Sequence, residues 1–134
     1  MKTISFSPPD ITEAEIKEVA EALRSGWITT GPRTKKLEKE IANYCGTNKV
    51  VCLNSATASL ELNLRVLGIG PGDEVITSAY TYTASASVID HIGAKIVLID
   101  TAAGSYEMDY EKLESVITER TKAIIPVDLA GIPC

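Results

Sequence analysis

Short apolar runs alternate with helical patterns along most of this chain, beginning at Lys49. The runs span residues 50–53, 75–77, 96–99 and 123–129, and the segments between them carry apolar residues at helical spacing. Apolar runs without strict alternation are typical of strands covered on both faces, and helical crossovers between strands favour parallel pairing. The sequence therefore predicts an α/β fold with the order β-α-β-α-β-α-β and a mainly parallel sheet.

Two amphipathic helices are predicted before the first of these runs. Thr12 and Glu15 form a capping box, and apolar residues then recur at i, i+3, i+4 and i+7 until Gly26. The second helix has a similar apolar stripe and ends at Gly46. We expect the first helix to lie on a core by its stripe. The two stripes consist of Ile16, Val19, Ala20 and Leu23, and of Leu37, Ile41 and Tyr44.

Composition and charge exclude several classes of function. The 134 residues, of which 45% are hydrophobic and 23% charged, suit one globular core or part of one. A net charge of -5 argues against a nucleic-acid-binding surface, which needs clustered Lys and Arg. No apolar run approaches the roughly 20 residues that cross a bilayer, and the N-terminus lacks the apolar segment of an export signal. We therefore expect a cytoplasmic protein that acts on small molecules or a protein partner, with no nucleic acid or membrane involved.

No metal site is predicted. Cys45 and Cys52 are separated by six residues, against the roughly two to four typical of zinc pairs, and Cys134 leaves an odd number of cysteines. His91 has no Cys or carboxylate partner at metal spacing, so it is interpreted as a surface or helix-end residue.

A phosphate site is one interpretation of the segment that follows the first apolar run. Residues 54–59 are small or hydroxylated and open the next helix. The first N–H groups of a helix have no internal acceptor, and the helix dipole favours an anion there. Ser55 and Thr57 add hydroxyl donors, but the same residues are also good helix caps. Phosphate binding and plain capping both stay open.

Two tyrosines lie where the second apolar run ends. Tyr80 and Tyr82 stand among small hydroxylated residues in the segment 78–87. Aromatic rings at a strand end can stack on a flat ligand ring, and core packing is an equally good explanation. Asp128 likewise has two readings, an acid that orients a ligand or a strand-end carboxylate satisfied by loop N–H groups.

Several separated segments, in order along almost the whole chain, carry a family resemblance. The chain resembles the DegT/DnrJ/EryC1/StrS aminotransferases, which implies the N-terminal part of the large domain of a fold-type I transferase dependent on pyridoxal 5'-phosphate (PLP). Residues 1–48 would form a helical N-terminal arm with a substrate-side loop, and residues 49–134 the alternating β/α part. The segments that carry the resemblance are residues 25–32, 54–58, 71–76, 80–82, 93–94 and 119–127, with Gly131 and Pro133.

The resemblance also implies roles for individual residues. Ala56 and Thr57 match positions that bind the cofactor phosphate, and together with Ser55 they form the predicted phosphate site. Tyr82 matches the aromatic residue that stacks on the pyridine ring. A loop near the substrate side of the cleft is matched by Trp27, Thr29, Thr30 and Gly31.

The implied reaction is transfer of an amino group, with glutamate as the usual donor, to a nucleotide-linked keto-sugar in polysaccharide or glycan precursor biosynthesis. Members are usually homodimers with active sites at the subunit interface. Two positions depart from the family pattern: Asp128 stands where many members have His, and Ser87 where Asn is common. Substrate contacts at these two positions are therefore not carried over.

Family members are several hundred residues long, so the Schiff-base lysine and the acid that pairs with the pyridine nitrogen are expected beyond Cys134. None of the nine lysines of this chain is placed to replace that lysine. The 134-residue chain alone is predicted to be inactive and to bind PLP weakly. The alternative is a non-catalytic α/β domain that binds a phosphate ligand or another chain. A nucleotide-binding domain is disfavoured, because no G-x-G-x-x-G follows the first apolar run.

Overall fold

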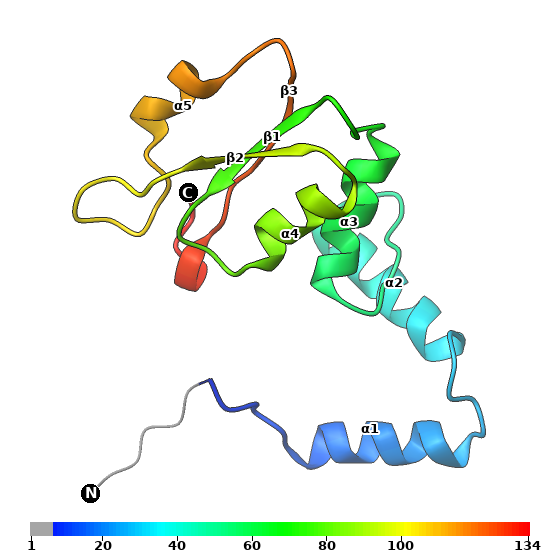
Figure 1. Cartoon of the computed structure of the whole chain (residues 1–134). Coiled ribbons are helices and arrows are strands. Elements are labelled where there is room, and N and C mark those ends of the chain that lie inside the picture. The colour runs from blue at the N-terminus through cyan, green and yellow to red at the C-terminus, as the bar shows by residue number, and fades with distance from the viewer. Residues whose placement is uncertain (1–6) are drawn as a thin grey trace, which may run out of the picture. The chain divides into compact units, whose positions relative to one another are not determined.

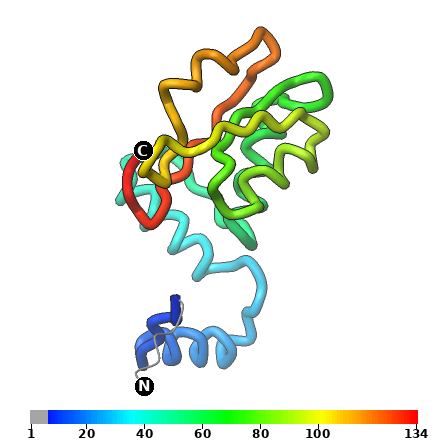
Figure 2. Tube along the Cα trace, turned by 60° about the vertical axis from the view of Figure 1, so that its left-hand side comes forward, coloured from blue at the N-terminus to red at the C-terminus, as the bar shows by residue number. Residues whose placement is uncertain are grey.

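The protein is described by a computed structural model that covers residues 7–134 (Figures 1 and 2). The chain divides into two compact units, one ending at Cys52 and the other running from Leu53 to Cys134. The division into an arm, residues 1–48, and an alternating part, residues 49–134, stays a prediction about the domain of the whole protein.

The first unit contains helices α1 (Glu13–Arg24) and α2 (Pro32–Cys45). The predicted capping box is present: the Thr12 hydroxyl accepts from the N–H of Ala14 at 3.2 Å, and the Glu15 carboxylate accepts from the N–H of Thr12 at 2.6 Å. Helix α2 ends as predicted at Gly46, whose φ of 66° is a left-handed conformation that favours glycine.

The prediction that the first helix lies on a core by its apolar stripe is wrong for the described residues. Ile16 and Leu23 are 52% and 64% exposed. The reason is that the charged residues of α1 lie on its opposite face, and it is this face that carries the ion pairs to α2. Arg33 of α2 pairs there with Glu18 and with Glu21. The apolar stripe is thereby left open.

The second unit holds a three-stranded sheet in the order β2-β1-β3. Both pairs are parallel, which confirms the predicted mainly parallel sheet. The elements of this unit are α3 (Ala56–Val66), β1 (Glu74–Ser78), α4 (Ala84–His91), β2 (Lys95–Ile99), α5 (Tyr110–Val116), β3 (Thr121–Ile125) and a 3-10 helix, η1 (Leu129–Gly131).

Helices cover both faces of this sheet (Figure 1). Neighbouring residues of a strand point to opposite faces. Val75 accordingly belongs to an apolar cluster with Val88 and Ile89 of α4, on the face that α3 and α4 cover. The next residue, Ile76, belongs to a second cluster against which Leu113 of α5 packs. The central strand β1 is buried along its whole length.

Two of the predicted strands differ from the structure. Residues 50–53 form no strand, and β3 ends at Ile125 instead of continuing to Leu129. A strand needs a neighbour to satisfy its backbone, and residues 50–53 pair with none of the strands β2, β1 and β3. Pro126 has no backbone N–H to donate, so the ladder stops before it. Apolar composition alone does not distinguish such segments from true strands.

Glu74 is a buried carboxylate at the amino end of the central strand. It is 2% exposed and accepts hydrogen bonds from Lys95 Nζ at 2.9 Å, Arg120 Nη2 at 2.8 Å and Thr118 Oγ1 at 2.7 Å. The Thr118 hydroxyl, then the Lys95 hydrogen bond and the positive charges of Arg120 and Lys95, lower the pKa of Glu74 to about 2. Lys95 begins β2 and Arg120 directly precedes β3, so the Glu74 carboxylate links the amino ends of all three strands.

Glu74 should therefore contribute to stability in a pH-dependent way. Its folded pKa lies below its ordinary value of 4.5, so this contribution is fully present above about pH 4.5 and is lost as the pH falls through the folded pKa near 2. We expect Glu74→Gln to lower the melting temperature at pH 7. The difference from wild type should shrink as the pH is lowered from about 4.5 towards 2. Thermal unfolding followed by circular dichroism measures this.

The matched control is Glu114→Gln, which removes an exposed carboxylate of α5. It should leave the melting temperature almost unchanged at every pH, because an exposed charge far from buried partners contributes little. A pH-independent difference for Glu74→Gln would contradict the assigned role of its charge.

Candidate functional site

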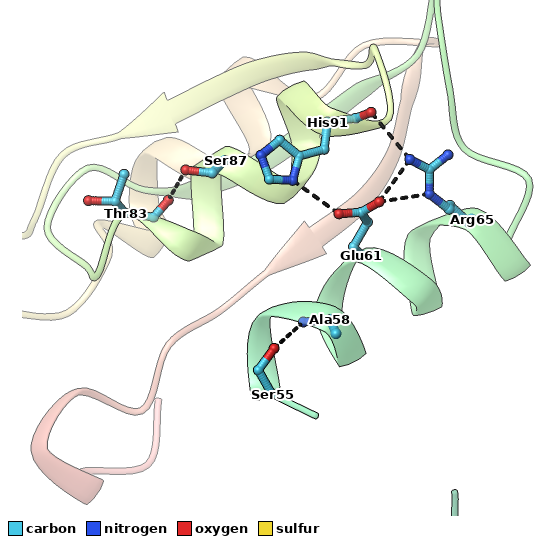
Figure 3. A network of polar contacts seen from close by, with 7 residues as sticks. All are labelled: Ser55, Ala58, Glu61, Arg65, Thr83, Ser87 and His91. Carbon is cyan, nitrogen blue, oxygen red and sulfur yellow. Dashed lines mark hydrogen bonds and ion pairs between the residues drawn. The ribbon is translucent and has the colours of Figure 1, made fainter. Parts of the chain in front are cut away.

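The start of α3 combines a satisfied cap with free backbone donors. Ser55 is the N-cap, and its hydroxyl accepts from the N–H of Ala58 at 3.0 Å (Figure 3). Plain capping is thus confirmed for Ser55. As at any helix start, the N–H groups of Ala56 and Thr57 have no acceptor among the described residues. They leave this helix end able to bind an anion.

Tyr80 and Tyr82 differ in their surroundings. The ring of Tyr80 stacks on that of Tyr106, with centroids 5.5 Å apart and an interplanar angle of 24°. Tyr82 is 80% exposed and lies just before the Thr83 cap of α4, whereas Tyr80 is 55% exposed. Tyr82 is therefore the more accessible of the two to a ligand.

The phosphate-site residues and Tyr82 lie at the same edge of the sheet. Tyr82 follows the carboxyl end of β1 and so lies at that edge of the sheet. The end of α3 leads into the amino end of β1, so the start of α3, where the phosphate-site residues lie, is at the opposite, carboxyl edge. Helices α3 and α4 lie side by side and run in the same direction, with Ser55 and Thr83 at corresponding ends (Figure 3). In open α/β sheets, ligands bind outside the carboxyl ends of the strands.

The predicted substrate-side residues lie in the first unit, where Trp27 closes over the start of α2. The Trp27 indole N–H donates to the carbonyl of Thr30 at 3.1 Å. A Cβ at Gly31 would overlap Trp27 Nε1, so a side chain there would displace the ring. Since φ of Gly31 is -163°, space and not backbone conformation requires glycine.

This contact predicts an optical change, because Trp27 is the single tryptophan of the chain. Gly31→Ala should break the Trp27–Thr30 hydrogen bond, shift the emission of Trp27 to longer wavelength and lower its anisotropy. Steady-state fluorescence measures both. Gly70→Ala is the matched control, since a Cβ at Gly70 would meet its nearest neighbour at 3.7 Å, an ordinary contact. Identical spectra for Gly31→Ala and wild type would show that the ring does not occupy this position.

A pocket of about 530 Å³ adjoins Trp27. Its basic residues already have acidic partners: Arg33 pairs with Glu18 and Glu21, and Lys36 lies 3.8 Å from Glu40. Sequence reasoning identified Trp27 and its neighbours but missed these charged residues, which looked like a solvated helix face. The pocket is lined by Glu18, Glu21, Ser25, Trp27, Thr29, Gly31, Pro32, Arg33 and Lys36.

Sequence reasoning also missed a polar network on α3 and α4. Glu61 of α3 accepts from Arg65 Nε at 2.9 Å and Arg65 Nη2 at 2.8 Å, and lies 3.0 Å from His91 Nδ1 (Figure 3). The hydrogen bonds from Arg65 and then from His91 lower the pKa of Glu61. His91 is the last residue of α4, which confirms its interpretation as a helix-end residue.

The two residues that depart from the family pattern are both engaged within the chain. Asp128 Oδ1 accepts from the N–H of Cys134 at 3.0 Å, which confirms the reading of a carboxylate satisfied by a loop N–H. The Ser87 hydroxyl donates to the carbonyl of Thr83 at 2.9 Å, one turn earlier in α4.

Across residues 7–134, none of the helices combines the length and the apolar character needed to span a membrane. Within the same residues, no group of three or more His, Cys, Asp or Glu side chains is arranged to hold a metal ion.

Sugar aminotransferases are among the known proteins that resemble this chain in sequence and structure. The chain is 50% identical over 123 residues to the UDP-4-amino-4-deoxy-L-arabinose--oxoglutarate aminotransferase of Shewanella sediminis, covering 92% of this chain and 32% of that protein. It is 45% identical over 131 residues to the spore coat polysaccharide biosynthesis protein SpsC of Bacillus subtilis, covering 98% and 34%.

A solved structure of Spr1654 from Streptococcus pneumoniae in its PLP form superimposes with a TM-score of 0.94 and 66% sequence identity, covering 99% of this chain and 34% of that one. The chain thus spans about a third of the length of these relatives. Residues 9–134 match the family described as the DegT/DnrJ/EryC1/StrS aminotransferase family. On this evidence, the chain belongs to the DegT/DnrJ/EryC1/StrS aminotransferase family.

Proposed function

We propose that the protein is a PLP-dependent aminotransferase that transfers an amino group from glutamate to a nucleotide-linked keto-sugar in the cytoplasm, for polysaccharide or glycan precursors. The observation that carries this is that α3 and α4 begin side by side, with Ser55 and Thr83 at corresponding ends (Figure 3). Ala56 and Thr57 directly follow Ser55 in the chain, and Tyr82 directly precedes Thr83. Unpaired helix N–H groups suit the phosphate of PLP, and an exposed aromatic face suits its pyridine ring.

The residues present fit the cofactor. The N–H groups of Ala56 and Thr57 would bind the phosphate, with the Thr57 hydroxyl as a further donor, and Ser55 would hold the turn by capping α3. The ring of Tyr82 would cover one face of the pyridine. When bound, PLP supplies an electron sink for the reacting carbon of the substrate. The protein's part here is to orient the cofactor by its phosphate and ring.

The substrate proposal is supported by the S. sediminis relative, whose name includes a UDP-linked amino sugar and oxoglutarate. Oxoglutarate is the keto acid that glutamate becomes when it gives up its amino group, so glutamate is the proposed donor. The loop with Trp27, Thr29, Thr30 and Gly31 is proposed to line the substrate side, and the pocket beside Trp27 supports this.

We also propose a homodimer. The apolar stripe of α1 and the exposed Leu37 and Tyr44 of α2 support it, because apolar helix faces of this kind are usually covered in the functional assembly. Helices α1 and α2 would then reach towards the partner subunit.

Loss of the Thr57 hydroxyl tests the cofactor site. In the intact encoded protein, Thr57→Val should weaken PLP binding by about 1–3 kcal/mol, the range for a lost hydrogen bond to a charged group. Titration followed by PLP absorbance measures the dissociation constant. Thr57→Ser keeps the hydroxyl and should retain most of the affinity. If Thr57→Val binds PLP as tightly as wild type does, the proposed phosphate site is wrong.

The alternative function is a non-catalytic α/β domain that binds a phosphate ligand or another chain. The two proposals differ in what must follow Cys134. The aminotransferase requires coding sequence that continues into an acidic residue for the pyridine nitrogen and a lysine for covalent attachment. Reading the frame beyond Cys134 distinguishes them.

A further inference from the structure

Two helices carry the two parts of the proposed cofactor site. The phosphate donors lie at the start of α3, and Tyr82 immediately precedes α4. The distance between the two parts therefore depends on how α3 and α4 are placed along each other. The phosphate of PLP is joined to its ring by one short CH2–O linker, so PLP can engage both parts only within a narrow range of placements.

Apolar packing alone specifies this placement poorly. Leu64 of α3 belongs to one cluster with Val88 and Ile89 of α4, and contacts of this kind are non-directional. Interchangeable apolar contacts permit small shifts of one helix along another. A directional contact between the helices is needed to hold one register.

Glu61 supplies that contact. Its carboxylate binds Arg65 on its own helix and lies 3.0 Å from His91 Nδ1 on the other, while Arg65 Nη2 donates to the His91 carbonyl at 3.3 Å (Figure 3). The Glu61 side chain is 29% exposed, against 51% for His91 and 53% for Arg65, so it is the most enclosed member. Two acceptors, the Glu61 carboxylate and the His91 carbonyl, thus bind across the helix pair.

We propose that Glu61 is a positioning residue that holds α3 and α4 in the register in which the phosphate donors of Ala56 and Thr57 and the ring of Tyr82 fit one PLP molecule. This inference rests on the proposed function. Glu61 and His91 lie away from the helix starts, so they touch neither end of the cofactor and act through helix placement (Figure 3).

A structural role and a positioning role predict different results. The Glu61–Arg65 pair joins residues of one helix, so only the contacts that Glu61 and Arg65 make with His91 bear on the register. Partly exposed ion pairs contribute little to stability, and alanine is the best helix former, so Glu61→Ala should fold. The effect of Glu61→Ala should appear in the affinity for a ligand that must engage both parts of the site at once.

The experiment compares two probes, PLP and pyridoxal, in the intact encoded protein. Pyridoxal lacks the phosphate and engages the ring site only, whereas PLP must engage both helices. A smaller folded fraction would weaken both probes equally, so the ratio of their dissociation constants reports placement alone. We expect Glu61→Ala to lower the preference for PLP over pyridoxal about tenfold, which corresponds to one hydrogen bond to a charged group.

Three further variants complete the test. His91→Ala should lower the ratio as Glu61→Ala does, and His91→Gln should largely restore it, because the amide keeps an N–H donor. Glu40→Ala is the matched control: it removes the i,i+4 pair with Lys36 on α2 and should leave the ratio unchanged.

Two outcomes overturn the inference in distinguishable ways. A wild-type protein that binds PLP no better than pyridoxal would refute the proposed phosphate site, and the positioning role with it. A wild-type preference that persists unchanged in Glu61→Ala would refute the positioning role and leave the proposed function standing.

Discussion

Replacement of Ile89 by alanine is expected to lower the free energy of unfolding by about 2–5 kcal/mol, the range for truncating a buried aliphatic residue to alanine. Ile89 lies in α4, is 0% exposed and belongs to the cluster that joins α3 and α4 to the sheet. The loss combines the transfer free energy of the removed carbons with the cavity left behind. Urea denaturation followed by circular dichroism measures it.

Two further variants serve as comparisons for Ile89→Ala. Ile89→Val removes one methylene and should cost about 0.5–1.5 kcal/mol. Asp90→Ala changes the exposed neighbour on the same helix and should cost little. A loss for Ile89→Ala no larger than that for Ile89→Val would mean that α4 does not pack on the sheet as described.

The elements that could be predicted from the sequence are those with local signals. The capping box at Thr12, the glycine at position 46 and the helical spacing of apolar residues locate helices without reference to the rest of the chain. The runs that became β1 and β2 are short, apolar and bounded by turn residues, which is why they were identified and their parallel pairing expected.

The features that could not be predicted depend on distant partners. Residues 50–53 look like a strand, but a strand forms only beside a neighbour, and these residues pair with none of the described strands. The apolar stripe of α1 looks like a core face, yet α2 binds the opposite face through Arg33. Glu74 looks like an exposed strand-entry charge and is buried by partners 21 to 46 residues away. The spacing of apolar residues within a segment does not indicate which distant residues will pair with that segment.

In the candidate site, too, features with local signals could be predicted, and features that depend on distant partners could not. The sequence located the phosphate-site residues at a helix start and Tyr82 after the run that became β1, and the structure has α3 begin at Ala56 and β1 end at Ser78. Their roles in binding PLP stay predictions. The closure of Trp27 over Gly31 and the link between Glu61 and His91 are matters of side-chain packing. Residues of these types are common on surfaces, so nothing in their local sequence distinguished them.

The 134-residue polypeptide should form no stoichiometric adduct on any one lysine when it is mixed with PLP and reduced with borohydride. Lys95 begins β2 and Lys122 is the second residue of β3, so both lie near the amino ends of the strands, opposite the candidate site. Lys112 belongs to α5, which packs against the other face of the sheet. Covalent capture needs an amine held next to the aldehyde carbon.

The charge state of Lys112 adds a second reason. Its Nζ lies 2.6 Å from Asp109 Oδ2, and this hydrogen bond raises the pKa of Lys112. A protonated amine has no lone pair with which to attack an aldehyde, so the partner suppresses the reaction as well as restraining the side chain. The reduced chain, weighed intact by mass spectrometry, should show only scattered partial labelling, and pyridoxal as a control should label to the same extent. A stoichiometric adduct on one lysine, together with amino transfer from glutamate, would instead place the reactive amine within these 134 residues.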